Sequence, residues 1–170
     1  MQSFKASVTL AWLLALCPAF AGTARYRACW RDTPATTMVI GWDQVDGSNP
    51  TLYYDTADHG TNTGAYAFSQ TPDRVVSYKG MDNRFVRLAG LTADTTYYFV
   101  IADSNSTSAR MKFRTAPDDD SPFTLIAGGD SRNNWDVRID ANRMAAKLKP
   151  LFIMFGGDMT SGDTSSEWQA

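Results

Sequence analysis

The spacing of apolar residues changes once along the chain, and this change limits the fold more than any other feature of the sequence. As far as residue 115, short runs alternate between apolar and polar positions. In residues 36–44 (TTMVIGWDQ) one face would carry Met38, Ile40 and Trp42. Strict alternation is typical of a β-strand that is buried on one side only. After residue 122 the apolar runs are continuous and a helical repeat separates them, so the sequence predicts two different parts.

Residues 22–117 are expected to form an antiparallel β-sandwich. Further short runs are rich in aromatic and β-branched residues, and turn-forming clusters separate them: 51–56, 84–91, 96–103 and 109–116. Short strands at this spacing are typical of a sandwich. Residues 91–97 (LTADTTY) resemble the tyrosine corner of immunoglobulin-like and fibronectin type III sandwiches, in which a tyrosine hydroxyl bonds to upstream backbone. We therefore expect Tyr97 and Trp42 to be core residues.

Residues 118–170 predict a strand, a helix and a second strand, after a linker at 116–122 (APDDDSP) whose two prolines cannot continue a strand ladder. The runs 123–127 (FTLIA) and 151–155 (LFIMF) are continuous, as in strands buried on both faces. Between them, apolar residues recur at helical spacing: Val137, Ala141, Met144, Ala145 and Leu148. Asn133 or Asn134 would begin this helix and Pro150 would end it. Such a unit is almost always a right-handed crossover between parallel strands.

A Gly-Gly-Asp sequence follows each of the two continuous runs, and it places Asp130 and Asp158 just beyond the two strand ends. Parallel strands end at the same edge of a sheet, where open α/β folds bind ligands. Neighbouring strands lie about 5 Å apart. Two carboxylates at that distance repel each other, and a cation between them would remove the repulsion. A single Gly-Gly-Asp sequence would be explained more simply as a turn at the end of a strand. Two such sequences, each at the same position after a strand, favour Asp130 and Asp158 as ligands of a divalent or trivalent metal ion.

The order of these features resembles the secreted, purple acid phosphatase-like members of the calcineurin-like metallophosphoesterases. The resemblance rests on the sandwich, on residues 123–132 (FTLIAGGDSR) and on residues 151–169 (LFIMFGGDMTSGDTSSEWQ). It implies a fibronectin type III-like sandwich followed by the first β-α-β unit of an α/β metallophosphoesterase domain. It also implies two metal ions (Fe, Mn or Zn) and a phosphate-ester substrate, with Asp130 as a ligand of one ion and Asp158 as the bridge between both.

Two positions depart from the family pattern. Arg132 stands where the family carries Gly or a metal-binding His, and its guanidinium could bind a phosphate oxygen. The alternative for Arg132 is a salt bridge at the sheet edge. Ser161 replaces an iron-binding Tyr, which favours manganese, zinc or ferrous iron over a ferric site. Asp163 is a reserve ligand, although a turn residue is the simpler interpretation.

The function classes that remain are few. A two-metal hydrolase needs roughly six protein ligands, and this sequence offers two, so we interpret it as the N-terminal fragment of a larger enzyme, inactive alone. The alternative is a fibronectin-like extracellular binding or adhesion module with a non-catalytic phosphoesterase remnant. A nucleotide-binding α/β domain would need a glycine-rich or lysine-bearing phosphate loop after its first strand, and residues 128–132 (GGDSR) are neither.

The N-terminus predicts export. Lys5, an apolar stretch at residues 8–20 and small residues near Ala21 are typical of a secretory signal peptide spanning residues 1–21. The stretch is shorter than the roughly 20 residues of a membrane-spanning helix. Cys17 leaves a lipoprotein open as an alternative, which Leu16 before it disfavours. We expect a secreted protein, extracellular or periplasmic, with no membrane anchor once the signal is removed.

Two residues and the net charge complete the expectations. Cys29 would be the single cysteine of the exported chain, and we expect a half-buried, small apolar residue there. His59 lies in a polar loop and is expected to be exposed and unrelated to any metal. A net charge of −2 argues against a nucleic-acid partner. The oligomeric state stays open.

Overall fold

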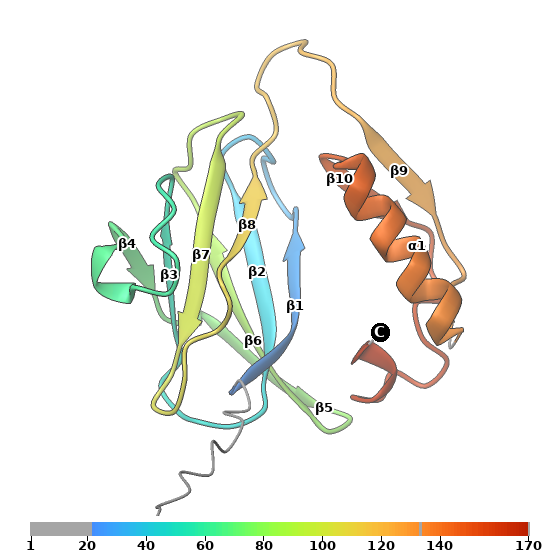
Figure 1. Ribbon diagram of the computed structural model, residues 1–170, viewed down its shortest axis with the longest axis horizontal. Coiled ribbons are helices and arrows are strands. Elements are labelled where there is room, and N and C mark those ends of the chain that lie inside the picture. Colours follow the sequence, from blue (N-terminus) through green and yellow to red (C-terminus); the bar gives the residue numbers. More distant parts are fainter. Residues whose placement is uncertain (1–21, 133, 170) are drawn as a thin grey trace, which may run out of the picture.

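The computed structural model describes residues 22–132 and 134–169. The predicted signal segment, with Cys17, and the candidate cap Asn133 lie outside the described residues. Two four-stranded sheets form one part of the molecule, and a strand–helix–strand unit lies beside them (Figure 1). The elements are β1 (Thr23–Cys29), β2 (Met38–Gln44), β3 (Thr51–Asp55), η1 (Thr63–Ala65), β4 (Phe68–Gln70), β5 (Arg74–Tyr78), β6 (Met81–Leu88), β7 (Thr96–Ala102), β8 (Met111–Arg114), β9 (Leu125–Gly128), α1 (Trp135–Leu148), β10 (Phe152–Phe155) and η2 (Glu167–Gln169).

The predicted antiparallel sandwich is confirmed. One sheet has the strand order β1-β2-β6-β5 and the other has the order β4-β3-β7-β8, and all neighbours within them are antiparallel. The alternation in β2 faces the core as expected, because Met38 is 4% exposed and Ile40 and Trp42 are fully buried. The remaining core residues come from both sheets and from the turn before β7: Leu52, Val86, Leu88, Leu91, Tyr97, Phe99, Ile101 and Phe113.

Neither β4 nor β5 was predicted from the sequence. β4 and β5 are edge strands in the two sheets, and neither contains a buried residue. An edge strand with both faces open to solvent needs no alternating apolar residues. The signal on which the prediction depends is therefore missing from these two segments.

The tyrosine corner is also confirmed. The backbone N–H of Thr92 donates a hydrogen bond of 2.9 Å to the Tyr97 hydroxyl oxygen. The Tyr97 ring is 5% exposed and stacks on Phe113 with 5.5 Å between the ring centroids. The hydroxyl thus fixes the chain where it enters β7, while the ring fills the core.

We predict that Tyr97→Phe lowers the free energy of unfolding by about 1–2 kcal/mol, because the Thr92 N–H loses its partly buried acceptor. Denaturant titration would measure the change. Tyr78→Phe is the matched control, since it removes the same atom from a side chain that is 57% exposed. Its effect should stay within about 0.5 kcal/mol. Equal effects of the two substitutions would contradict the role assigned to the corner.

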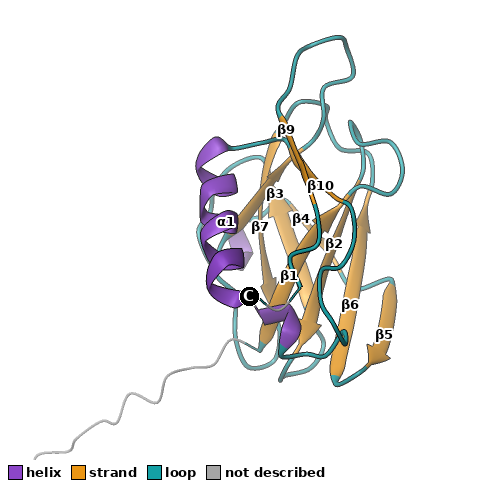
Figure 2. Ribbon diagram, turned by 90° about the vertical axis from the view of Figure 1, so that its right-hand side faces the viewer, coloured by secondary structure: helices purple, strands orange, loops and turns teal. Residues whose placement is uncertain are grey.

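The second part of the chain has the predicted order of elements. β9 and β10 pair in parallel, with Phe152 opposite Leu125 and Phe155 opposite Gly128. α1 connects them and lies on one side of the pair (Figure 2). The helix ends at Leu148, before Pro150 as expected, and the next residue, Lys149, adopts a left-handed conformation (φ 49°). Asn134 precedes the helix, but its side chain makes no capping hydrogen bond.

The expected burial of this second part is wrong. β9 and β10 were predicted to be buried on both faces, yet Ile153 is 49% exposed and Met154 57%. The apolar face of α1 is open too, with Val137 67% exposed and Met144 66%. The cause is that two strands and one helix are too few elements to cover one another. The strands and the helix form where the apolar pattern predicted them, but the described residues cover only part of their apolar surface, as where Phe152 packs against Trp30.

Contacts between the two parts are few and specific. Phe152 of β10 packs against Trp30 with ring centroids 4.5 Å apart. Arg25 Nε donates to the Ser165 carbonyl at 2.8 Å, and Lys79 Nζ donates to the Gly162 carbonyl at 2.7 Å. The loop after β10 therefore contacts the sandwich at two places, β1 and the β5–β6 turn.

Two smaller expectations need correction. Cys29 is exposed rather than half-buried, because it is the last residue of β1, an edge strand of its sheet. His59 is half-buried rather than exposed, since its Nε2 lies 3.2 Å from Asp55 Oδ2 and its ring meets Tyr66 edge-on. Burial opposes ionisation of Asp55, but hydrogen bonds, first among them that from the Ala67 N–H, outweigh it and lower the pKa of Asp55. No helix in residues 22–132 and 134–169 is long and apolar enough to cross a membrane.

Candidate functional site

The backbone carries Asp130 and Asp158 to the same edge of the parallel pair. Hydrogen bonds between the strands continue beyond the ends of β9 and β10. Asp130 N–H donates to the Gly157 carbonyl and Arg132 N–H to the Asp158 carbonyl, both at 2.9 Å. The two aspartates that are 28 positions apart in sequence therefore lie on adjacent segments of backbone. Their convergence is the geometry that the two Gly-Gly-Asp sequences predicted, while metal binding by them stays a prediction.

Gly129 and Gly157, which directly precede the two aspartates, have different structural roles. A Cβ at Gly129 would lie 3.2 Å from the Gly156 nitrogen and 3.3 Å from its Cα, so a side chain there would push the two segments apart. Gly157 has a φ of 112°, which L-residues rarely adopt. One glycine thus permits close approach of the backbones, and the other permits the turn.

Arg132 joins the two carboxylates. Its Nε donates to Asp130 Oδ1 at 2.7 Å, and its Nη2 donates to Asp158 Oδ2 at 2.9 Å. The hydrogen bond and the charge of Asp130, followed by those of Asp158, raise the pKa of Arg132. The salt bridge at the sheet edge, one of the two roles considered for Arg132, is present in this structure. A phosphate contact by the same guanidinium stays a prediction.

All three side chains face solvent. The Arg132 side chain is 62% exposed, that of Asp130 67% and that of Asp158 57%. Solvent screens both ion pairs and makes each of them weak. The same exposure leaves the carboxylate oxygens and the guanidinium accessible to an ion or an anionic substrate.

Backbone conformations at this edge are unusual. Asp130 (φ 54°), Arg132 (φ 37°) and Asp158 (φ 51°) all lie in the left-handed region. Aspartate tolerates this region because its short side chain bonds to local backbone, whereas arginine gains no such help. Residues held in sparsely populated conformations cluster at functional sites, and the Arg132 backbone is the clearest case here.

Arg138 is a positioning residue that the sequence analysis missed. Its Nη1 donates to the Met159 carbonyl at 3.0 Å and to the Glu167 carbonyl at 3.3 Å, and it reaches the Arg132 carbonyl at 3.4 Å. It thereby ties the segments that follow β9 and β10 to the first turn of α1. A cation in the first helical turn opposes the helix dipole, and this unfavourable placement was the available signal.

The other acids of the loop are used locally. Asp163 Oδ1 accepts a hydrogen bond of 2.6 Å from Thr160 Oγ1, and the Asp163 N–H donates back to the same oxygen at 3.1 Å. Glu167 Oε2 accepts from the N–H groups of Gly162 and Thr164, each at 3.0 Å. In this structure Asp163 acts as the turn residue that the simpler interpretation expected.

The donor set fits one side of a metal centre. Two carboxylates that meet on one cation are hard oxygen ligands, suited to divalent ions. Next to them, Ser131 Oγ is buried and has no hydrogen-bond partner among the described residues. No group of three or more His, Cys, Asp or Glu side chains that could hold a metal ion occurs in residues 22–132 and 134–169. Asp130 and Asp158 would therefore need further ligands to complete a site.

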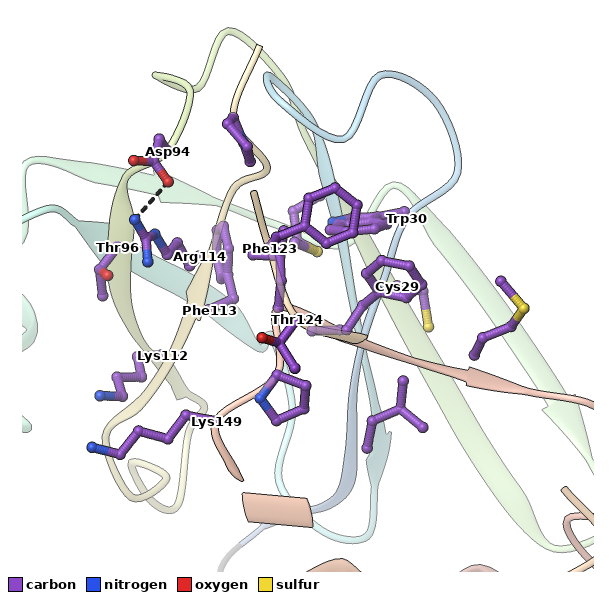
Figure 3. A pocket seen from close by; sticks show the side chains of 18 of the residues that line it. Cys29, Trp30, Asp94, Thr96, Lys112, Phe113, Arg114, Phe123, Thr124 and Lys149 are labelled. Atoms are coloured by element: carbon purple, nitrogen blue, oxygen red, sulfur yellow. Dashed lines mark ion pairs between the residues drawn. The ribbon is translucent and has the colours of Figure 1, made fainter. Parts of the chain in front are cut away.

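A large groove among the described residues lies elsewhere. A groove of ≈ 1330 Å³ runs between the sandwich and the strand–helix–strand unit, and neither Asp130 nor Asp158 lines it. Figure 3 shows aromatic rings, including Trp30 and Phe123, on one side of it and lysine side chains on the other. Arg114 in its wall pairs with Asp94 at 2.6 Å. The groove exists where the two parts pack loosely, and the carboxylate chemistry is at the open sheet edge instead.

Comparison with known families decides what the sandwich is. A family model described as "Purple acid Phosphatase, N-terminal domain" matches residues 24–115, more than half of the chain. The chain belongs to this family. The match ends at the last strand of the sandwich, so the purple acid phosphatase N-terminal domain coincides with the two four-stranded sheets.

One solved structure matches more of the chain than this domain. The structure of PhoD matches with a TM-score of 0.58 at 16% identity and covers 81% of this chain. That share exceeds what residues 1–117 could supply, so the superposed region extends into residues 118–170. At this identity the match shows similarity of fold alone. The chain spans 27% of the length of that structure.

A further match has a lower score. The sensor domain of the anti-sigma factor RsgI4 in Pseudobacteroides cellulosolvens matches at 19% identity over 61% of this chain and 99% of that one, with a TM-score of 0.39 that supports no argument. A comparison with curated protein sequences finds no match.

Proposed function

We propose that this chain is the N-terminal part of a secreted phosphoesterase that hydrolyses phosphate esters at a centre of two metal ions. The observation that carries the proposal is the meeting of Asp130 and Asp158 on one cation, the Arg132 guanidinium, at the edge of a parallel strand pair. This edge follows a purple acid phosphatase N-terminal domain in the chain, where the family's catalytic domain would begin. The extent of the PhoD match beyond the sandwich supports the same assignment.

Each residue of the edge has a proposed role. Asp130 would hold one ion and Asp158 would bridge both, with the remaining ligands outside the described residues. Arg132 would bind an oxygen of the substrate phosphate, for which its planar guanidinium is suited. When bound, the two ions would neutralise charge on the phosphoryl group and lower the pKa of a water. Manganese, zinc or ferrous iron would suit the site better than ferric iron, because Ser161 supplies no phenolate.

The metal requirement provides the test. A chain that carries this sequence together with the rest of the proposed catalytic domain should hydrolyse p-nitrophenyl phosphate or bis(p-nitrophenyl) phosphate. Activity should disappear on chelation with EDTA and return with Mn²⁺ or Zn²⁺, and the loaded protein should lack a visible charge-transfer band. The 170 residues alone should be inactive in the same assay.

Two results would count against the proposal. Turnover that survives exhaustive chelation would exclude the metal centre. No turnover with any of these metals would favour the alternative, a fibronectin-like extracellular binding module. Recovery of the protein in the extracellular or periplasmic fraction, cleaved after residue 21, would test the proposed export.

A further inference from the structure

We propose that Arg132 is a built-in cation that holds Asp130 and Asp158 together while no metal ion is bound, and that metal binding displaces its side chain toward the substrate. This inference rests on the proposed function, because it concerns regulation of the same site. It assigns Arg132 two successive partners, first the carboxylates and then a phosphate oxygen.

The geometry is that of a bridging ion. Nε and Nη2 of one guanidinium each bond a different carboxylate, at 2.7 Å to Asp130 and 2.9 Å to Asp158. Without a cation, two carboxylates on adjacent backbone segments repel each other. A guanidinium carries several N–H donors in a fixed plane and can bond both carboxylates at once, whereas the compact lysine ammonium matches this geometry poorly. Arg132 thus supplies the charge that a metal ion would otherwise supply.

The guanidinium and a metal ion compete for the same place. A divalent cation held by both carboxylates would repel a guanidinium that shares their oxygens. The backbone of Arg132 would stay, because its N–H donates to the Asp158 carbonyl at 2.9 Å. The side chain, 62% exposed, has open solvent into which it can turn. Displacement would therefore move one exposed side chain and leave the sheet edge in place.

A second arginine shows what a purely structural role looks like. Arg138 donates to backbone carbonyls of residues 132, 159 and 167 and is half-buried. The Arg132 guanidinium instead pairs with two exposed carboxylates, and solvent screens both ion pairs. Because its ion pairs to the predicted metal ligands are weak, Arg132 is better suited to being displaced by a metal ion than to a permanent structural role.

The test measures metal binding rather than activity. Amide resonances of the chain are followed by NMR as Mn²⁺ is added, since the paramagnetic ion broadens signals near its site. We expect weak broadening around residues 130 and 158 in the unmodified chain. In Arg132→Gln the same residues should broaden at a Mn²⁺ concentration roughly threefold to tenfold lower, the range that loss of two exposed ion pairs would account for. Arg132→Lys should lie between the two.

Controls separate this inference from the proposed function. Arg143→Gln removes an exposed arginine that pairs with Asp140 at 3.3 Å on the same helix face, and it should bind Mn²⁺ as the unmodified chain does. Unchanged sandwich resonances, such as that of the Trp42 indole, would show that each variant is folded. Broadening around residues 130 and 158 at the same Mn²⁺ concentration in Arg132→Gln as in the unmodified chain would overturn this inference alone. Absence of broadening at these residues in every variant would overturn it together with the metal site.

Discussion

Replacing Asp158 by asparagine is expected to lower kcat/KM for a phosphate ester at least about a hundredfold in a chain that includes the complete catalytic domain. Substitution of residues that only orient metal ligands already lowers metal affinity or activity by roughly 10- to 100-fold. Asp158 is proposed as the ligand shared by both ions, so its loss would weaken both. Steady-state kinetics at saturating Mn²⁺, with metal content determined for each preparation, would measure the effect.

Asp163→Asn is the matched control for this prediction. Asp163 lies in the same loop, and its carboxylate bonds Thr160 within a turn. The amide of asparagine can accept the same hydrogen bond, so activity should stay close to that of the unmodified protein. If Asp158→Asn retained activity and full metal content while Asp163→Asn lost both, the ligand roles would have been assigned to the wrong acid.

Trp42→Ala is expected to lower the free energy of unfolding by roughly 3–5 kcal/mol, the usual cost of truncating a large aromatic residue in a core. Trp42 is fully buried between the two sheets. Its Nε1 also donates to Gln44 Oε1 at 2.9 Å inside the fold, so the substitution leaves that buried oxygen without its donor. Denaturant titration monitored by circular dichroism would give the change.

The control for the core prediction is Val45→Ala, just beyond the end of the same strand. Val45 is 59% exposed, and removal of its methyl groups should change stability by no more than about 0.5 kcal/mol. A Trp42→Ala protein as stable as Val45→Ala would mean that the sandwich does not depend on the core described above.

The alternation of apolar and polar residues predicted much of the sandwich, because residues that are close together in sequence produce this alternation. Met38, Ile40 and Trp42 alternate, and all three face the core. The tyrosine corner was predictable for the same reason, since Tyr97 bonds backbone only five positions upstream. The edge strand Arg74–Tyr78 was missed, because a strand without a buried face leaves no alternation in the sequence.

Part of the candidate site was predictable from the sequence and part was not. Two Gly-Gly-Asp sequences at the ends of two continuous apolar runs were enough to predict that Asp130 and Asp158 share a sheet edge. The ion pair of Arg132 with both of them, and the anchoring of their loops by Arg138, could not be predicted. Which of several acceptors a long, flexible arginine finds depends on segments that meet only after the strands have paired.

By itself the sequence determined the two-part organisation, the period of each segment, and the acidic turn after each continuous run, because each of these depends on residues close together in the chain. Only the tertiary structure decided the burial. Ile153, Met154 and Val137 have the pattern of covered residues and are nevertheless exposed. Apolar periodicity specifies which face seeks a partner, while burial requires that another element be present to pack against that face.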